Sequence, residues 1–483
     1  MTRALAAVAG VALLLAAAAS AADAFTNTEP FAAEQWYLPL DRAWDFWPSQ
    51  PQLAPIRVAV VDSGVDGKQP DLEGRILLAK SFVGGSALTD TDGHGTFVAG
   101  EIAANPSNGI GIAGLAFNAR LLIAKVVTPD GSVPLAAEVA AIHWAVDHGA
   151  RVVNLSLGGV RDPLDPSLDT YSPQEEQAVE YAYAKGAVVV AAVGNGPQSP
   201  HTPWPFAHYP AALPHVIGVS AVRRDGSVPA YSNRDSVYND LAAPGDAIFS
   251  TIPYGLVTDP ACPEGPYSVC GPLEFRDAIG TSFAAPQVAA AAALLLGEVP
   301  SLTPDQVAWA LERGAVDEDA ATGCPECSAG RDAFTGWGRL DVARSLALAT
   351  DGARLPPLDA YEPNDDAGAF SHALPPLPRS FVATLDDWDD DRDVYRVVLK
   401  AGQRLYARLT AENAGRVTLE LWSPRTRRIE GADAALRLTV ARAVGKQRRL
   451  AYTARKSGTY YLAATLENGL RDRTRYRLAV ARA

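Results

Sequence analysis

Hydrophobic residues between positions 50 and 350 form short continuous runs, and longer segments with amphipathic spacing separate them. Continuous apolar runs of this length are typical of strands that are buried on both faces, here at residues 56–62, 121–126, 152–156, 187–193 and 216–220. Spacing of apolar residues predicts helices at 135–148, at 173–185, at 304–313 and from about Ser282 onward. This alternation predicts an α/β fold, a mainly parallel sheet with helices on both faces.

The pattern changes after residue 350. Residues 351–358, Asp-Gly-Ala-Arg-Leu-Pro-Pro-Leu, have the composition of a linker. From 359 to 483, apolar and polar residues alternate in seven or eight short segments that are separated by turns. Such alternation is typical of strands with one buried face, and it predicts a C-terminal antiparallel β-sandwich domain.

Residues 1–24 have the pattern of a signal peptide. Arg3 is followed by a small and apolar run to Ala19, and then by small residues that suit cleavage after Ala21 or Ala24. The run is shorter than the roughly 20 residues that span a bilayer, although an uncleaved anchor is the alternative. Since no later stretch looks able to cross a membrane, we expect an exported protein that is secreted, periplasmic or extracellular. We also expect it to be a monomer.

Charge and cysteine content narrow the class further. The net charge of −13 argues against nucleic acid or an anionic membrane as the main partner. In an exported chain, the four cysteines predict disulfides. Four cysteines allow three connectivities, of which we favour the two local pairs, Cys262–Cys270 and Cys324–Cys327. Neither a zinc site nor a thioredoxin-like redox centre has the sequence context that it needs.

Three polar motifs stand out against this background. Asp62 ends an apolar strand, His94 lies between two glycines, and Ser282 lies between a small-residue turn and an apolar helix. A serine hydroxyl becomes a nucleophile when a base takes its proton, and the base needs an acid to orient it. The order Asp, His, Ser is the subtilisin order, as against other orders in unrelated serine hydrolases.

These segments, Val58–Gly64, Asp92–Thr96 and Gly280–Gln287, resemble the subtilisin-like serine proteases, the subtilase family. The resemblance implies that residues 25–350 form a peptidase domain, a secreted serine endopeptidase with Asp62, His94 and Ser282 as its catalytic residues. It implies protein or peptide substrates, an acyl-enzyme intermediate and no cofactor for the chemistry. Asn195, after a buried strand, matches the side-chain donor of the family's oxyanion hole.

The same resemblance implies where substrate binds. Ser156, Leu157 and Gly158 match the strand that binds extended substrate through its backbone. His208 falls where family members often carry a small residue at the base of the specificity pocket, which implies a narrower or more polar pocket.

A structural calcium ion is also implied by the resemblance. Asp71 and Asn108 match positions of the family's tight site, and Gln35 is a third candidate ligand. Oxygen atoms of these types are what Ca²⁺ prefers. An ordinary turn at Asn105–Ile110 is the alternative. For the acidic run Asp386–Asp393, a solvated turn and a second ion are both open.

Three features of the resemblance concern the chain outside the triad. Tyr361–Asp365, the acidic run and Gly458–Leu462 look like the pre-peptidase C-terminal domain found beside secreted bacterial proteases, and we expect this domain to bind substrate or the cell surface. Phe283 replaces the methionine usual after the serine. The short stretch before Asp62 leaves no room for the family's folding pro-domain, so the enzyme folds unaided or its start is missing from the sequence.

Two other function classes remain open at this point. A surface protein that keeps the fold without the chemistry is one, although a decayed enzyme is expected to lose at least one member of the catalytic set. An esterase is the other, because the same mechanism cleaves esters.

Overall fold

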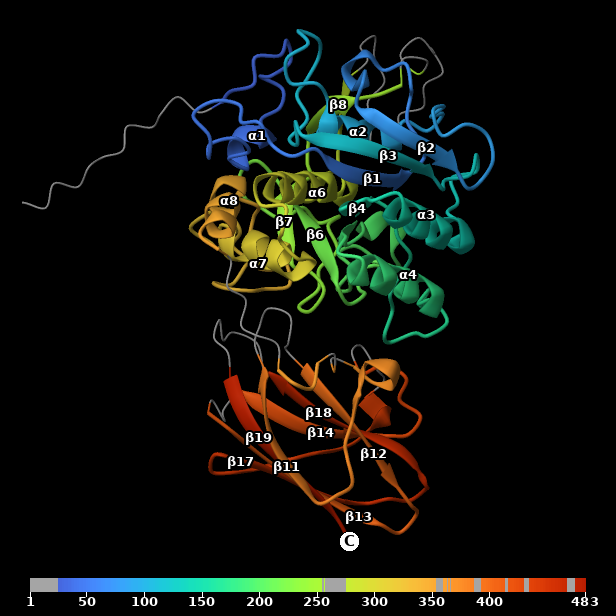
Figure 1. Ribbon diagram of the computed structural model, residues 1–483, viewed down its shortest axis with the longest axis vertical. Helices are drawn as coiled ribbons and strands as arrows, with labels where there is room; N and C mark the ends of the chain where they lie inside the picture. Colours follow the sequence, from blue (N-terminus) through green and yellow to red (C-terminus); the bar gives the residue numbers. More distant parts are fainter. Residues whose placement is uncertain are drawn as a thin grey trace, which may run out of the picture.

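Two units follow one another along the chain (Figure 1). The computed structural model describes residues 25–253, 256, 275–352, 359–362, 364, 366–385, 392–412, 416–429, 434–466 and 474–483. The first unit contains strands and helices, and the second is built from strands. In these residues, no helix is both long enough and apolar enough to cross a membrane.

A seven-stranded parallel sheet forms the centre of the first unit, in the order β2-β3-β1-β4-β5-β6-β7. Its strands are β1 (Ile56–Asp62), β2 (Ile76–Ser81), β3 (Ala119–Lys125), β4 (Val152–Leu155), β5 (Val188–Ala192), β6 (Val216–Val222) and β7 (Leu241–Pro244). The predicted α/β fold with a mainly parallel sheet is confirmed. Strands β2 and β7 were not predicted, because β2 is mostly exposed and β7 is only four residues long.

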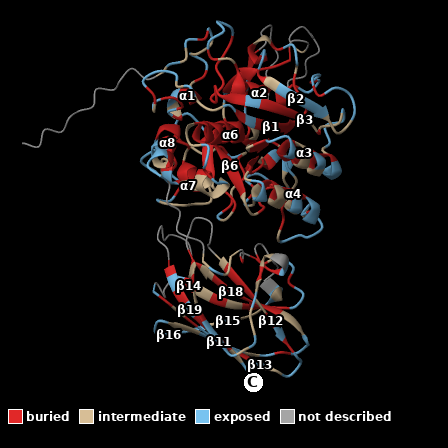
Figure 2. Ribbon diagram, in the orientation of Figure 1, coloured by how far each residue is buried: buried red, intermediate tan, exposed pale blue. Residues whose placement is uncertain are grey.

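Helices cover both faces of this sheet. One face packs against α2 (His94–Ala103), α6 (Thr281–Glu298), α7 (Pro304–Gly314) and α8 (Val342–Thr350), and the other against α3 (Leu135–Asp147) and α4 (Pro173–Ala184). Strand β1 shows why its run is continuously apolar: Val58 and Val60 face the first core, and Ala59 and Val61 face the second. Figure 2 shows α6 and most strands of the sheet buried, and β2 and the outer faces of α3 and α4 exposed.

Two smaller elements support the N-terminal half of the first unit. The short helix α1 (Tyr37–Leu40) packs Tyr37 and Leu38 into the first core. A two-stranded antiparallel sheet, β8 (Ile248–Thr251) and β9 (Phe275–Ala278), lies beside α2, where Ser250 Oγ donates to the Phe97 carbonyl at 2.7 Å.

The second unit is an antiparallel β-sandwich, as the alternating pattern predicted. One five-stranded sheet has the order β10-β12-β18-β14-β15, and the other β11-β19-β13-β17-β16. The strands are β10 (His372–Ala373), β11 (Arg379–Leu385), β12 (Arg392–Leu399), β13 (Arg404–Ala411), β14 (Val417–Trp422), β15 (Arg437–Val440), β16 (Arg442–Val444), β17 (Gln447–Thr453), β18 (Gly458–Leu466) and β19 (Thr474–Arg482). Inward-facing residues of both sheets form one core. The resemblance to the pre-peptidase C-terminal domain stays a prediction.

One arginine of the sandwich reaches into the first unit. Arg428 Nη2 donates to the Ala212 carbonyl and to the Tyr238 hydroxyl, each at 2.8 Å. Its guanidinium also lies over the rings of Tyr171 and Tyr209, 5.4 and 5.9 Å from their centroids. Arg428, which is largely buried, therefore links the sandwich to the loops that follow β4, β5 and β6.

Candidate active site

Asp62 and His94 form a hydrogen-bonded pair at the carboxyl end of the parallel sheet. Asp62 is the last residue of β1 and His94 the first of α2, and His94 Nδ1 lies 2.9 Å from both carboxylate oxygens. Burial lowers the pKa of His94, but the charge and hydrogen bond of Asp62 outweigh it and raise this pKa to about 9. The carboxylate therefore stabilises the imidazolium, as an acid that orients a base must.

A buried carboxylate that the sequence reasoning missed holds this pair in place. Asp90 accepts hydrogen bonds from the backbone N–H of Gly93 and Thr96, each at 2.9 Å, and from the Ser63 hydroxyl at 2.9 Å. Ser63 Oγ in turn accepts from the Gly95 N–H at 2.8 Å. Asp90 thus ties the residue after Asp62 to the first turn of α2. An aspartate just before a helix is a common N-terminal signal, and it could have been recognised.

Gly95, in the first turn of α2, packs so closely against the end of β1 that a side chain would not fit there. A Cβ at this position would lie 2.1 Å from the Gly64 carbonyl oxygen and 3.1 Å from Asp62 Oδ1. The helix can therefore approach the end of β1 closely enough for His94 to reach Asp62.

Ser282 lies in the first turn of α6, and its neighbours along the chain contact Asn195 and His94. The residue before it, Thr281, donates its backbone N–H to Asn195 Oδ1 at 3.0 Å. The residue after it, Phe283, places its ring 5.2 Å from the His94 ring, centroid to centroid. Gly280 has φ +147°, which a residue with a side chain rarely adopts, so the turn into α6 needs glycine. The three predicted catalytic residues thus lie in adjoining segments.

Asn195 follows β5 and lies beside the same turn. Its Oδ1 accepts from Thr281, so the amide group is oriented with Nδ2 as its donor side, and Nδ2 donates to Gln198 Oε1 at 3.3 Å. The Ser282 N–H belongs to the first turn of α6, where backbone donors have no partner inside the helix. The arrangement offers donors and the positive end of a helix dipole where a negative oxygen would form.

The predicted substrate segment runs alongside His208. Ser156 Oγ donates to the Ser282 carbonyl at 2.7 Å, and Gly159 and Tyr209 exchange two backbone hydrogen bonds of 2.9 Å. A Cβ on Gly158 would lie 2.5 Å from the Tyr209 carbonyl oxygen, so the segment after Leu157 also needs glycine. The structure places Ser156, Leu157 and Gly158 directly between Ser282 and the His208 segment.

His208 itself is buried and electrically neutral near pH 7. Burial lowers its pKa to about 4, and its Nε2 lies 2.8 Å from Ser199 Oγ. A Cβ on Gly194 would lie 2.5 Å from His208 Nδ1, so the imidazole occupies space beside the end of β5. A ring at this place narrows the space next to the substrate segment and adds polar atoms to it.

The residues predicted for calcium come together on the other side of α2. Asn108 Nδ2 donates to Asp71 Oδ1 at 3.0 Å, and Ile112 N–H donates to Asp71 Oδ2 at 2.8 Å. Gln35 Oε1 accepts from the next residue, Ala113, at 2.9 Å. Burial raises the pKa of Asp71 to about 7, and the charge of Glu29 contributes to this rise. Glu29 is itself 4% exposed, and its Oε2 has no hydrogen-bond partner among the described residues.

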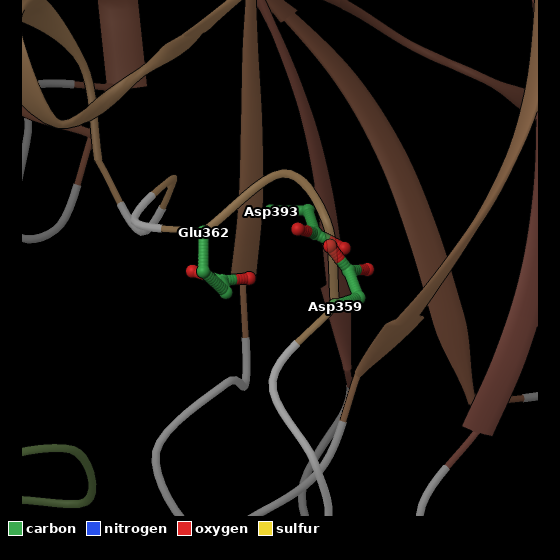
Figure 3. Close-up of side chains that lie close together, drawn as sticks. All are labelled: Asp359, Glu362 and Asp393. Carbon is green, nitrogen blue, oxygen red and sulfur yellow. The ribbon is translucent and has the colours of Figure 1, made fainter.

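A second acidic cluster lies at one end of the sandwich (Figure 3). One carboxylate oxygen from each of Asp359, Glu362 and Asp393 falls within 4.8 Å of the others. Burial raises the pKa of Asp393 well above its usual value, and the charges of Asp359 and Glu362 add to this. Carboxylates so close either share protons or hold a hard cation. Most of the acidic run that the sequence singled out, residues 386–391, lies outside the described residues.

One of the two predicted disulfides lies within the described residues. Cys324 and Cys327 form the predicted disulfide. The other predicted pair, Cys262 and Cys270, lies outside the described residues.

Comparisons with known proteins agree with this geometry. A family profile described as "Subtilase family" matches residues 55–338. Subtilisin DY of Bacillus licheniformis is 36% identical over 53% of this chain and 81% of its own length, and Thermitase of Thermoactinomyces vulgaris 33% identical over 57% and 86%. A solved structure of a protease from Pseudoalteromonas arctica matches with a TM-score of 0.54 and 27% identity, over 67% of this chain and 99% of that one.

Proposed function

Because the chain belongs to the subtilase family and is a serine peptidase of the subtilisin type, we propose that it is an exported endopeptidase that acts through Asp62, His94 and Ser282. The observation that carries this proposal is the hydrogen-bonded Asp62–His94 pair beside the turn that presents Ser282. Residues 25–350 would form the peptidase domain and 359–483 the sandwich, with export directed by residues 1–24.

In the proposed mechanism, Ser282 Oγ attacks the carbonyl carbon of the scissile peptide bond. His94 Nε2 takes the hydroxyl proton and then gives it to the leaving amine, which breaks the C–N bond and leaves an acyl group on Ser282. Water then attacks the acyl-enzyme with His94 again as base, and the acid product and free Ser282 are released. Asp62 keeps the imidazole oriented and stabilises its charged form.

The negative oxygen that forms in each attack needs donors that already point at it. We assign this role to Asn195 Nδ2 and the Ser282 backbone N–H. The hydrogen bonds from Thr281 to Asn195 Oδ1 support the assignment, because they fix which side of the amide is the donor. Gln198, which accepts from Nδ2, would give up this contact when the oxyanion forms.

Substrate would bind as an extended strand beside Ser156, Leu157 and Gly158, so that its backbone supplies most contacts. The buried imidazole of His208 then favours a small or polar side chain at the residue before the scissile bond. Replacing His208 by glycine is expected to shift the preference toward large apolar side chains, measured as kcat/KM across a peptide library. His201→Gly, on the exposed part of the same loop, is the matched control, and an unchanged preference in His208→Gly contradicts this reading.

A structural calcium ion fits the site around Asp71. The candidate ligands offer several oxygen atoms. Burial, together with the charge of Glu29, raises the pKa of Asp71, so a cation there would offset the cost of the buried negative charge. Asp71, Asn108 and Gln35 would hold the ion through their side-chain oxygens. The ion would stabilise the fold and take no part in the chemistry.

A fluorophosphonate probe that labels activated serines tests the proposed activity. We expect the full chain to be labelled and Ser282→Ala to remain unlabelled, and we expect the labelled protein to lose cleavage of a peptide amide. No labelling of the parent chain would favour a surface protein that has lost the chemistry. Labelling with ester cleavage and no amide cleavage would favour the esterase alternative.

A further inference from the structure

A broad groove of about 950 Å³ crosses the outer face of the sandwich sheet β11-β19-β13-β17-β16, away from the proposed active site. Small residues form its floor: Ala451, Ala479 and Ala481. The other lining residues include Tyr406 and four arginines, Arg379, Arg408, Arg442 and Arg449. None of the described residues that line the groove is acidic.

Three of these arginines lie in one row across three neighbouring strands. Arg408 on β13 is directly opposite Arg449 on β17, and Arg449 is directly opposite Arg442 on β16. Neighbouring strands are about 4.8 Å apart, so the row concentrates three positive charges within about 10 Å. Like charges directly opposite one another destabilise a sheet. The sandwich thus carries an electrostatic cost that its own packing does not explain.

No carboxylate among the described residues neutralises this row. Arg449 donates instead to the neutral amide oxygen of Gln447, at 2.9 and 2.7 Å. On the other sheet, by contrast, Arg437 pairs with Glu420 at 2.7 Å. The groove is therefore a place where a negatively charged ligand would find unpaired cations.

The distribution of charge along the chain points to the same place. Residues 359–483 hold 22 Arg and Lys against 16 Asp and Glu, a net charge of +6. Residues 1–358 hold 20 against 39, a net charge of −19. The net charge of the peptidase unit repels a polyanion, and that of the sandwich attracts one. The chain can therefore have a basic binding surface although its overall net charge is negative.

We propose that this groove binds an extended, Asp/Glu-rich segment of another polypeptide. The arginine fork matches carboxylates, with which it forms paired hydrogen bonds. The alanine floor leaves room for a main chain close to the sheet. Single-stranded nucleic acid, the other polyanion with an extended backbone, is bound through several stacked aromatic rings, whereas Tyr406 is the one aromatic ring among the described residues that line the groove.

Together with the proposed protease activity, on which this step rests, the groove becomes a second binding site for acidic protein substrates. A substrate held there has a raised effective concentration at the active site of the same chain. Binding by the groove does not itself depend on that activity, so the two can be tested separately.

Binding is measured with the full chain carrying Ser282→Ala and a fluorescein-labelled oligoglutamate peptide, by fluorescence anisotropy. We expect binding that weakens as salt is added, because exposed ion pairs are screened. The double change Arg408→Gln and Arg449→Gln is expected to weaken it about tenfold, the combined effect of two exposed ion pairs near the upper end of their range. The control, Arg455→Gln with Lys456→Gln, removes the same charge from the exposed β17–β18 turn and is expected to have little effect.

Three outcomes would overturn the proposal. The parent does not bind the peptide; or the control pair weakens binding as much as the groove pair, which makes it a bulk charge effect; or a labelled oligothymidylate of equal charge binds the groove more tightly than the peptide. An unchanged melting temperature of the groove variant shows that any loss of affinity is not loss of fold.

The catalytic consequence is tested in active enzyme. The groove variant is expected to cleave a small chromogenic peptide with the kcat/KM of the parent and an acid-rich protein substrate with a lower kcat/KM. Equal cleavage of the acid-rich substrate by both overturns its capture by the groove. If neither cleaves any peptide, the proposed protease function fails, while peptide binding that depends on Arg408 and Arg449 still supports the groove.

Discussion

Asp71 offers the sharpest test of the buried electrostatics. It is fully buried, and its oxygens accept hydrogen bonds from Ile112 N–H and Asn108 Nδ2. Burial raises its pKa to about 7, with Glu29 adding to the rise and Arg75 opposing it. Asp71→Asn keeps the size of the side chain and removes its charge. The change is made in the Ser282→Ala chain, so that the sample does not digest itself.

The direction of this stability change follows from the pKa of Asp71 in the folded and in the unfolded chain. An unfolded aspartate has a pKa of about 3.9. Because the folded pKa is higher, the contribution of Asp71 to stability is fully present below about pH 4 and is lost as the pH rises through about 7. A shift of about three pKa units corresponds to about 4 kcal/mol. The amide does not titrate and loses roughly one hydrogen bond, about 1 kcal/mol, so without calcium at about pH 8 we expect the variant to be more stable by about 3 kcal/mol.

If calcium binds at Asp71 as proposed, we expect it to reverse this order, because the carboxylate would become a ligand and the amide is a poorer one. The free energy of unfolding is measured by urea titration of tryptophan fluorescence, with EDTA or with calcium. Seven of the nine tryptophans lie in residues 25–350, so the signal reports mainly on that unit. Glu73→Gln, an exposed change of equal charge in the same segment, is the control. The reasoning is refuted if Asp71→Asn is less stable than its parent in EDTA at alkaline pH.

Three further predictions concern the active site and the domain contact. Because the base must be unprotonated, kcat/KM should rise with pH through the raised pKa of His94, about 9, and Asp62→Asn should move the midpoint lower; a profile that stays flat across neutral and alkaline pH contradicts this. Gly95→Ala should reduce kcat about 100-fold with a normal circular dichroism spectrum, because the clash displaces His94 from Asp62; turnover equal to the parent's speaks against it. Arg428→Ala should speed amide exchange at Ala212 and its neighbours, measured by mass spectrometry, while an unchanged rate would show that the sandwich does not protect this loop.

The sequence predicted what depends on local pattern. Asp62 could be placed at a strand end because the apolar run stops there. Strand β2 was missed because an edge strand with exposed leucines lacks the continuous apolar run of its buried neighbours. The predicted ends of β3 were also a residue or two off, since hydrogen-bond pairing fixes them and composition does not.

Contacts between distant segments could not be predicted in this way. Nothing near Arg428 in the sequence indicates that it meets Ala212 and Tyr238, because that contact requires two separately folded units to lie side by side. The row Arg408, Arg449 and Arg442 likewise depends on strand register, and a shift of one residue would turn those side chains to the other face.

Helix α6 has a consequence for how the enzyme would fail. Ser282 lies in its first turn, and nearly all of the residues that follow, mostly alanine and leucine, are buried against β1, β3 to β7, α2, α7 and α8. If Ser282 is the nucleophile, as proposed, its position at the start of this buried helix means that it cannot shift while the core around α6 stays intact. Heat inactivation and unfolding of this unit should therefore coincide, and a substitution deep in α6, such as Ala290→Val, should reduce turnover through the same displacement that lowers stability.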